Sequence, residues 1–105
     1  MNIEVKIYNK TATTKIAVLN GVEFEYNNLV LALRQLISTK ENASNGTFSI
    51  NKYCLDCDYD TIAKLVDLGL ARCYIFKQEE FYCIAAKDTV IPLLFGQLQG
   101  LQEVI

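Results

Sequence analysis

The first 26 residues alternate between apolar and polar positions in three short runs. Apolar side chains recur at every second position over residues 3–8, 15–19 and 22–26. A period of two is typical of strands that bury one face. The Asn20-Gly21 pair, which separates the second run from the third, is a strong hairpin signal. The pattern therefore predicts a small antiparallel β-meander over residues 1–26.

The spacing then changes to that of an amphipathic helix. Apolar residues three, four and seven positions apart form one stripe, made of Leu29, Val30, Leu33, Leu36 and Ile37. We expect Asn27 or Asn28 to cap this helix, because a short side-chain acceptor satisfies a free backbone N–H. Residues 41–46 are polar and end in glycine, which indicates a loop. A short strand is expected over residues 47–50.

A second helix is predicted over residues 58–68. Asp58 or Asp60 is expected to cap it, and the buried stripe is Tyr59, Ile62, Leu65 and Val66. Gly69 suits the left-handed position after the helix, from which Leu70 can fold back onto Leu65. The preceding segment, residues 51–57, is expected to form one or two helical turns.

Two apolar strands follow, over residues 71–76 and 81–86, around the polar loop at 77–80. Both faces of this hairpin are apolar, so it is either sandwiched inside the fold or paired with something. Asp88 begins the last helix, with Pro92 in its first turn, where a missing N–H is tolerated. The apolar stripe of this helix is formed by Ile91, Leu94, Phe95, Leu98 and Leu101. Gly96 and Gly100 weaken a helix but are acceptable if they permit close packing. Residues 102–105 are expected to fray.

The middle of this order resembles the winged helix-turn-helix superfamily. The matching segments are the helix at 28–40, the strand at 47–50, the helix at 58–68, the turn LVDLGLA at 65–71 and the wing at 71–86. The resemblance implies an α+β fold with a winged-helix-like core over residues 27–87. The β-meander over 1–26 and a C-terminal helix over 88–101 are additions to that core. The length of 105 residues predicts a single domain.

The resemblance implies DNA binding through the helix at 58–68, which would enter the major groove. The DNA-contacting residues would then be Lys52, Thr61, Lys64 and Lys77. The outward positions of this helix are predicted to be Asp60, Thr61, Lys64 and Asp67, with Asp56 and Asp58 just before it. Acids next to phosphate oppose binding, because non-specific affinity comes from cations that neutralise phosphate. The chain has 10 basic and 12 acidic residues and a pI of about 5.0, so charge disfavours this alternative.

Protein binding is the interpretation that we favour. The chain carries an excess of aromatic and apolar side chains in the hairpin and the last helix: Tyr74, Phe76, Phe81, Tyr82, Leu93 and Phe95. Aromatic residues anchor interfaces, although for most of these residues a place in the core is the simpler interpretation. The partner would be another protein or a second copy of this chain. The small build suits a cytoplasmic regulatory or accessory factor, such as one encoded by a phage or mobile element.

Candidate chemistry is sparse in this chain. It has no histidine, no P-loop and no dinucleotide fingerprint, so we expect no enzyme and no cofactor. Cys54 and Cys57 form a CxxC pair, but a structural zinc site needs four ligands and only the single cysteines Cys73 and Cys83 could add to them. A three-residue hairpin loop would place these last two opposite each other. We expect free thiols in a reducing cytosol.

Residues 56–60, DCDYD, resemble the opening of an EF-hand loop. Thr61 stands where that loop requires glycine, and Asp67 stands where it requires glutamate, so helix capping is the simpler interpretation. No apolar run approaches the roughly 18 residues that a membrane span needs. The chain also begins without a basic and apolar leader, so neither membrane insertion nor secretion is expected.

Overall fold

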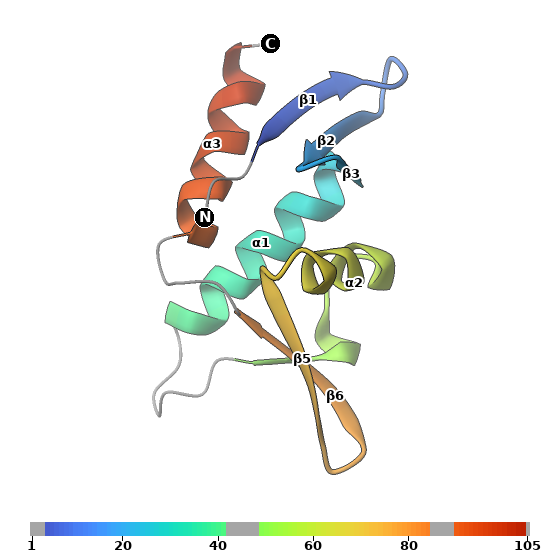
Figure 1. The fold of residues 1–105 in the computed structure, drawn as a ribbon, viewed down its shortest axis with the longest axis vertical. Coiled ribbons are helices and arrows are strands. Elements are labelled where there is room, and N and C mark those ends of the chain that lie inside the picture. The colour runs from blue at the N-terminus through green and yellow to red at the C-terminus, as the bar shows by residue number, and fades with distance from the viewer. Residues whose placement is uncertain (1–3, 42–48, 85–89, 105) are drawn as a thin grey trace.

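A computed structural model describes residues 4–41, 49–84 and 90–104 of the chain and shows an α+β fold (Figure 1). The elements follow in the order predicted from the sequence. They are β1 (Val5–Asn9), β2 (Lys15–Leu19), β3 (Val22–Glu25), α1 (Tyr26–Glu41), β4 (Ile50–Asn51), the 3-10 helix η1 (Lys52–Cys54), α2 (Tyr59–Asp67), β5 (Ala71–Phe76), β6 (Glu79–Ile84) and α3 (Val90–Val104).

The first sheet is the predicted antiparallel meander, in the order β1-β2-β3. Asn20 and Gly21 have φ angles of 50° and 84°, which a tight hairpin turn requires. The prediction was wrong about Tyr26, which begins α1 instead of ending the third strand. The helix starts early because the carboxylate of Glu25, and not Asn27 or Asn28, accepts a hydrogen bond from a first-turn N–H, that of Asn27, at 3.2 Å.

The second sheet has the order β4-β6-β5 and is also antiparallel. Its hairpin turns on two residues, Lys77 and Gln78, with φ angles of 51° and 68°. The predicted four-residue loop was therefore too long, because two consecutive left-handed residues already match the twist of paired strands. The resulting register sets Cys73 opposite Tyr82, so the two hairpin cysteines are not cross-strand partners.

The core packs along one side of α1, which crosses the molecule between the two sheets (Figure 1). One apolar cluster joins both sheets and all three helices, and its largest fully buried members include Phe24, Leu33, Leu65, Tyr82 and Leu98. The predicted stripe of α1 is confirmed, with Leu29, Leu33 and Leu36 buried and Val30 and Ile37 packed against them. The α3 helix packs against α1, and the Tyr26 hydroxyl donates to the Leu98 carbonyl at 3.5 Å.

The α2 helix ends as the sequence predicts. Gly69 has a φ of +79°, its N–H donates to the Val66 carbonyl at 3.0 Å, and the Leu70 N–H donates to the Leu65 carbonyl at 2.9 Å. This pair of bonds is a Schellman C-cap. The predicted faces need two corrections: Tyr59 is exposed, whereas Thr61 is buried. The one-turn helix η1 confirms the helical turn expected before α2.

The last helix extends to Val104, three residues beyond its predicted end at 101. Pro92 is the third residue of α3 and lies in its first turn, as predicted. The predicted helix start at Asp88 and the predicted end of the hairpin at residues 85–86 are outside the described residues. Gly96 and Gly100 have nothing within 4 Å of an added Cβ, so they do not serve close packing. The loop predicted at 41–46 lies mostly outside the described residues. No described helix has the length and apolar character needed to cross a membrane.

Candidate functional site

The first candidate surface is the face of α2, where the winged-helix resemblance places DNA. The four aspartates in and before this helix, Asp56, Asp58, Asp60 and Asp67, are exposed, as the sequence predicted. Asp58 is at the N-cap position, but its side chain makes no capping hydrogen bond. The outward side of α2 therefore carries predominantly negative charge.

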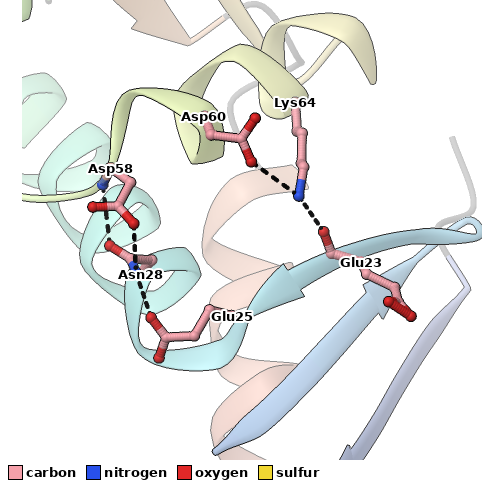
Figure 2. A network of polar contacts seen from close by, with 6 residues as sticks. All are labelled: Glu23, Glu25, Asn28, Asp58, Asp60 and Lys64. Atoms are coloured by element: carbon pink, nitrogen blue, oxygen red, sulfur yellow. Dashed lines mark hydrogen bonds and ion pairs between the residues drawn. The ribbon is translucent and has the colours of Figure 1, made fainter.

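A polar network ties the start of α2 to the start of α1 (Figure 2). The Asn28 Oδ1 atom accepts from the backbone N–H of Asp58 at 3.0 Å. The Nδ2 atom of the same side chain donates to the Glu25 carboxylate and, at 3.3 Å, to Asp58 Oδ2. Asn28 thus satisfies the backbone N–H of the N-cap residue itself, and its amide lies between two carboxylates that would otherwise repel each other. Sequence reasoning had proposed this asparagine, or Asn27, as the cap of α1, whereas Asn28 is the third residue of that helix and accepts a hydrogen bond from the start of α2.

Two of the three lysines predicted to contact DNA are already bound to neighbouring groups. Lys64 forms an ion pair with Asp60 at 3.2 Å, and its Nζ donates to the backbone carbonyl of Glu23 at 2.8 Å (Figure 2). Lys52 pairs with Glu80 at 3.2 Å and lies 4.6 Å from the centroid of the Tyr59 ring. The hydrogen bond with Glu80 raises the pKa of Lys52 above its ordinary value.

The remaining members of the predicted DNA-binding set also lie apart. Thr61 faces the core and cannot reach a groove, so its assignment as an outward residue was wrong. Lys77 is at the tip of the β5–β6 hairpin, 5.4 Å from the centroid of the Phe76 ring. The structure therefore does not bring these four residues together on one basic surface.

The second candidate surface is the distal half of the β5–β6 hairpin, which projects away from α3 and the first sheet (Figure 1). Tyr74 and Phe81 are paired across the strands, and their rings stack with centroids 5.6 Å apart. Phe76 meets Phe81 edge to face at 6.4 Å. Tyr74 is 38% exposed and Phe76 is 56% exposed. These three residues form an aromatic cluster on one face of the hairpin, which we call the hairpin cluster.

The opposite face of the same strand is also exposed near the tip. Ile75 is 71% exposed, although it lies on the face that buries Ala71 and Tyr82 closer to the body. The sequence showed that both faces of the hairpin are apolar but did not single out Ile75 as a partner-binding residue. The exposure of Ile75 depends on how far the hairpin extends beyond the helices, and the periodicity of apolar side chains does not predict that length.

The six predicted partner-binding residues fall into three places. Tyr74, Phe76 and Phe81 form the hairpin cluster, whereas Tyr82 is fully buried and belongs to the core. Leu93 is 70% exposed on α3, and Phe95 is partly buried there, with the Arg34 guanidinium 5.8 Å from its ring centroid. Because α3 lies away from the hairpin, the predicted hairpin-and-helix surface is not continuous (Figure 1).

All four cysteines are free thiols. Cys54 is exposed and Cys57 is buried, and desolvation by burial raises the pKa of Cys57. Desolvation likewise raises the pKa of Cys83, against a lowering effect of Arg72. Within the described parts of the chain, no three or more histidine, cysteine, aspartate or glutamate side chains are grouped to hold a metal ion.

The chain was compared with protein-family models, with curated proteins and with solved structures, and none of the three comparisons found a match.

Proposed function

We propose that this chain is a small, non-enzymatic regulatory or accessory protein that acts by binding another protein chain. The observation that carries this proposal is the hairpin cluster, in which aromatic rings remain open to solvent on a strand that also exposes Ile75. Aromatic side chains that stay exposed in a folded chain are typical anchors of interfaces. An accessory factor encoded by a phage or mobile element would suit this small build.

The arrangement of residues 26–84 supports the winged-helix resemblance. A helix, a short strand, a helical turn and a second helix precede a hairpin, and the short strand pairs with the second strand of that hairpin. The charges on α2 argue against the DNA-binding use of such a core. Its exposed carboxylates would face phosphate, while Lys52 and Lys64 are held by Glu80 and Asp60.

Binding to random duplex DNA, titrated with salt, separates the two functions. If the chain is a protein-binding factor, we expect no complex with duplex DNA even at low ionic strength. A DNA-binding regulator that uses Lys52, Lys64 and Lys77 would bind at low salt and lose affinity steeply as salt rises, because each neutralised phosphate releases counterions. Such a result would contradict the proposal.

Site-specific crosslinking tests where a partner binds. A photoreactive phenylalanine analogue at Phe76 would sample the hairpin cluster, and the same analogue at the exposed residue Tyr53 of η1 would be the matched control. In cells that carry the gene, we expect a defined protein adduct from position 76 and none from position 53. Equal adducts from both positions, or adducts to nucleic acid, would count against the proposed surface.

A further inference from the structure

The distal half of β5 is an edge strand without the usual protection against pairing. Its sheet has the order β4-β6-β5, so one side of β5 carries backbone N–H and C=O groups that no strand of this sheet pairs. Natural edge strands are blunted by charges, proline or bulges. Residues 74–76 are Tyr-Ile-Phe, and their register with β6 continues without a bulge.

The two edges of the first sheet do carry such protection. Edge strand β1 includes Lys6, which pairs with Glu4 at 3.1 Å, and β3 includes Glu23 and Glu25. The far side of β6 is partly covered by β4, and the Lys52–Glu80 ion pair lies just beyond it. Arg72 is the one charged residue of β5, so it is the distal part of this edge, residues 74–76, that differs from the edges of the first sheet, and its apolar side chains favour a partner strand.

We propose that two copies of this chain pair through their β5 strands, antiparallel about a twofold axis at Tyr74. This inference rests on the proposed function and names a second copy as the partner. The pairing would join the two three-stranded sheets into one continuous sheet. Directly opposite residues in such a pair lie on the same face, so the hairpin clusters of both copies would meet on one side.

The twofold register gives each exposed apolar residue of β5 a partner. Tyr74 would lie opposite Tyr74 of the second copy, which places two stacked Tyr74–Phe81 pairs side by side. On the other face, Ile75 would lie opposite Cys73 of the second copy, beside the buried Tyr82. Cross-strand aromatic and aliphatic pairs of this kind are the unit of sheet stabilisation.

Charge also fits this register. The exposed guanidinium of Arg72 would lie opposite Phe76 of the second copy, whose neighbour on β6 is Glu79. Arg72 would therefore be able to reach the Glu79 carboxylate, which is an attractive contact, whereas the Phe76 ring already has Lys77 Nζ at 5.4 Å from its centroid. If the twofold axis passed through Ile75 instead, Arg72 would lie opposite Gln78 of the second copy, which is in the turn beyond β5. If the axis passed through Cys73, Phe76 would lie opposite Leu70 of the second copy. Leu70 is already buried in its own chain, so the exposed Phe76 would gain no apolar partner.

The paired region is short, with five residues of each β5 strand facing their counterparts. Interfaces that bury less than about 1,200 Å² are typical of weak and transient complexes. The dimer is therefore expected to exchange with monomer as concentration changes, and measurements must span a wide concentration range.

Analytical ultracentrifugation of the full chain tests the pairing. Ile75→Lys places a charge on the paired edge, and Leu93→Lys is a matched control, because the two side chains are 71% and 70% exposed and Leu93 lies on α3. We expect wild type to dimerise with rising concentration, Ile75→Lys to weaken the dimer at least tenfold, and Leu93→Lys to leave it unchanged. A wild type that stays monomeric at millimolar concentration, or a dimer that Leu93→Lys disrupts and Ile75→Lys does not, would overturn the proposal.

Disulfide trapping tests the register independently. The exposed Cys54 is first replaced by serine, and Tyr74→Cys or Leu93→Cys is then added. Opposed residues of an antiparallel pair have Cα atoms about 4.5–5.5 Å apart, within disulfide reach. On mild oxidation, we expect a covalent dimer from Tyr74→Cys at concentrations where Leu93→Cys remains monomeric. Equal yields from the two variants would overturn the register.

The outcomes separate this inference from the proposed function. A monomeric wild type whose Phe76 position still crosslinks to another protein would remove self-pairing and leave the protein-binding function in place. A dimer that also binds duplex DNA at low salt would keep the pairing and remove the proposed function. Circular dichroism of each variant shows that a lost dimer does not come from a lost fold.

Discussion

Two glycines of this chain show how backbone conformation decides the effect of one methyl group. Gly69 has a φ of +79°, whereas Gly96 is inside α3, and neither has an atom within 4 Å of an added Cβ. Because space is open at both, Gly69→Ala should cost about 1 kcal/mol through left-handed strain, and Gly96→Ala should stabilise by up to about 1 kcal/mol. Urea denaturation of the two variants measures both effects. A loss of stability at both positions would contradict this explanation.

Tyr82 should make the fold sensitive to alkaline pH. Burial raises its pKa well above the ordinary value of 10.0, and contacts with Tyr59 and Cys73 raise it further. The folded state therefore keeps a proton that the unfolded chain releases above pH 10.0. The contribution of Tyr82 to the free energy of unfolding is complete below that pH and is lost as the pH rises beyond it. We expect wild type to lose more stability between pH 9 and pH 11 than Tyr82→Phe, by thermal denaturation at each pH. Parallel losses in both proteins would show that another group is responsible.

At the scale of elements, Asn28 couples two helices through one amide. It accepts from the Asp58 backbone at the start of α2 and donates to carboxylates on both sides (Figure 2). Asn28→Ala should destabilise the fold by about 1 kcal/mol, as the loss of a capping side chain does. Asn28→Asp should be worse at pH 7, because a third carboxylate would lie between Glu25 and Asp58.

The pH dependence of these two variants separates charge from hydrogen bonding. In Asn28→Asp, three carboxylates would repel one another at neutral pH, and acid removes the repulsion by neutralising them. The penalty is therefore full at pH 7 and falls as the pH is lowered. Chemical denaturation should show Asn28→Asp less stable than Asn28→Ala at pH 7 and at least as stable near pH 3.5. If the difference in the free energy of unfolding between the two variants did not change with pH, the electrostatic explanation would be contradicted.

The boundaries of several elements could be predicted from the sequence, and the exceptions have physical causes. The strands β2 and β5 were predicted at their observed bounds, because each is an apolar run that ends at a turn, Asn20-Gly21 after β2 and the polar residues after Phe76 in β5. The start of α1 was missed because a glutamate, which is not a preferred cap, supplies the capping carboxylate. The first two residues of β6 were missed because Glu79 and Glu80 look like loop residues. Their side chains contact Asn51 and Lys52, which no local pattern reveals.

At the scale of the whole molecule, the candidate site could be predicted only in part. The sequence shows that Tyr74, Phe76, Phe81 and Tyr82 share a hairpin, but it does not show which face of that hairpin the core covers or how far toward the tip the cover extends. Tyr82 lies near the body and is covered, whereas Phe76 lies toward the tip and remains exposed. The acidic character of α2 was predictable because its aspartates fall on one side of the helix. Thr61 was misplaced because a small polar residue gives no hydrophobic signal.

One apolar cluster joins both sheets to α3, so a change in that helix should be felt throughout the chain. Leu98 is fully buried, and its backbone carbonyl accepts from Tyr26 at the start of α1. Leu98→Ala should cost about 3 kcal/mol, as large-to-small changes in a core do. Leu93→Ala, on the exposed side of the same helix, should change stability by less than about 0.5 kcal/mol.

Hydrogen exchange shows whether that loss is shared between the two sheets. Because β2 and β6 bury their side chains in the same cluster as Leu98, we expect Leu98→Ala to reduce amide protection by the same factor in both strands. Leu93→Ala should leave protection unchanged in both. If protection fell in β2 while β6 kept its wild-type value, the two sheets would open independently. The hairpin that carries the candidate surface would then be stabilised separately from α3, and the binding strand could be held by a smaller unit than the whole chain.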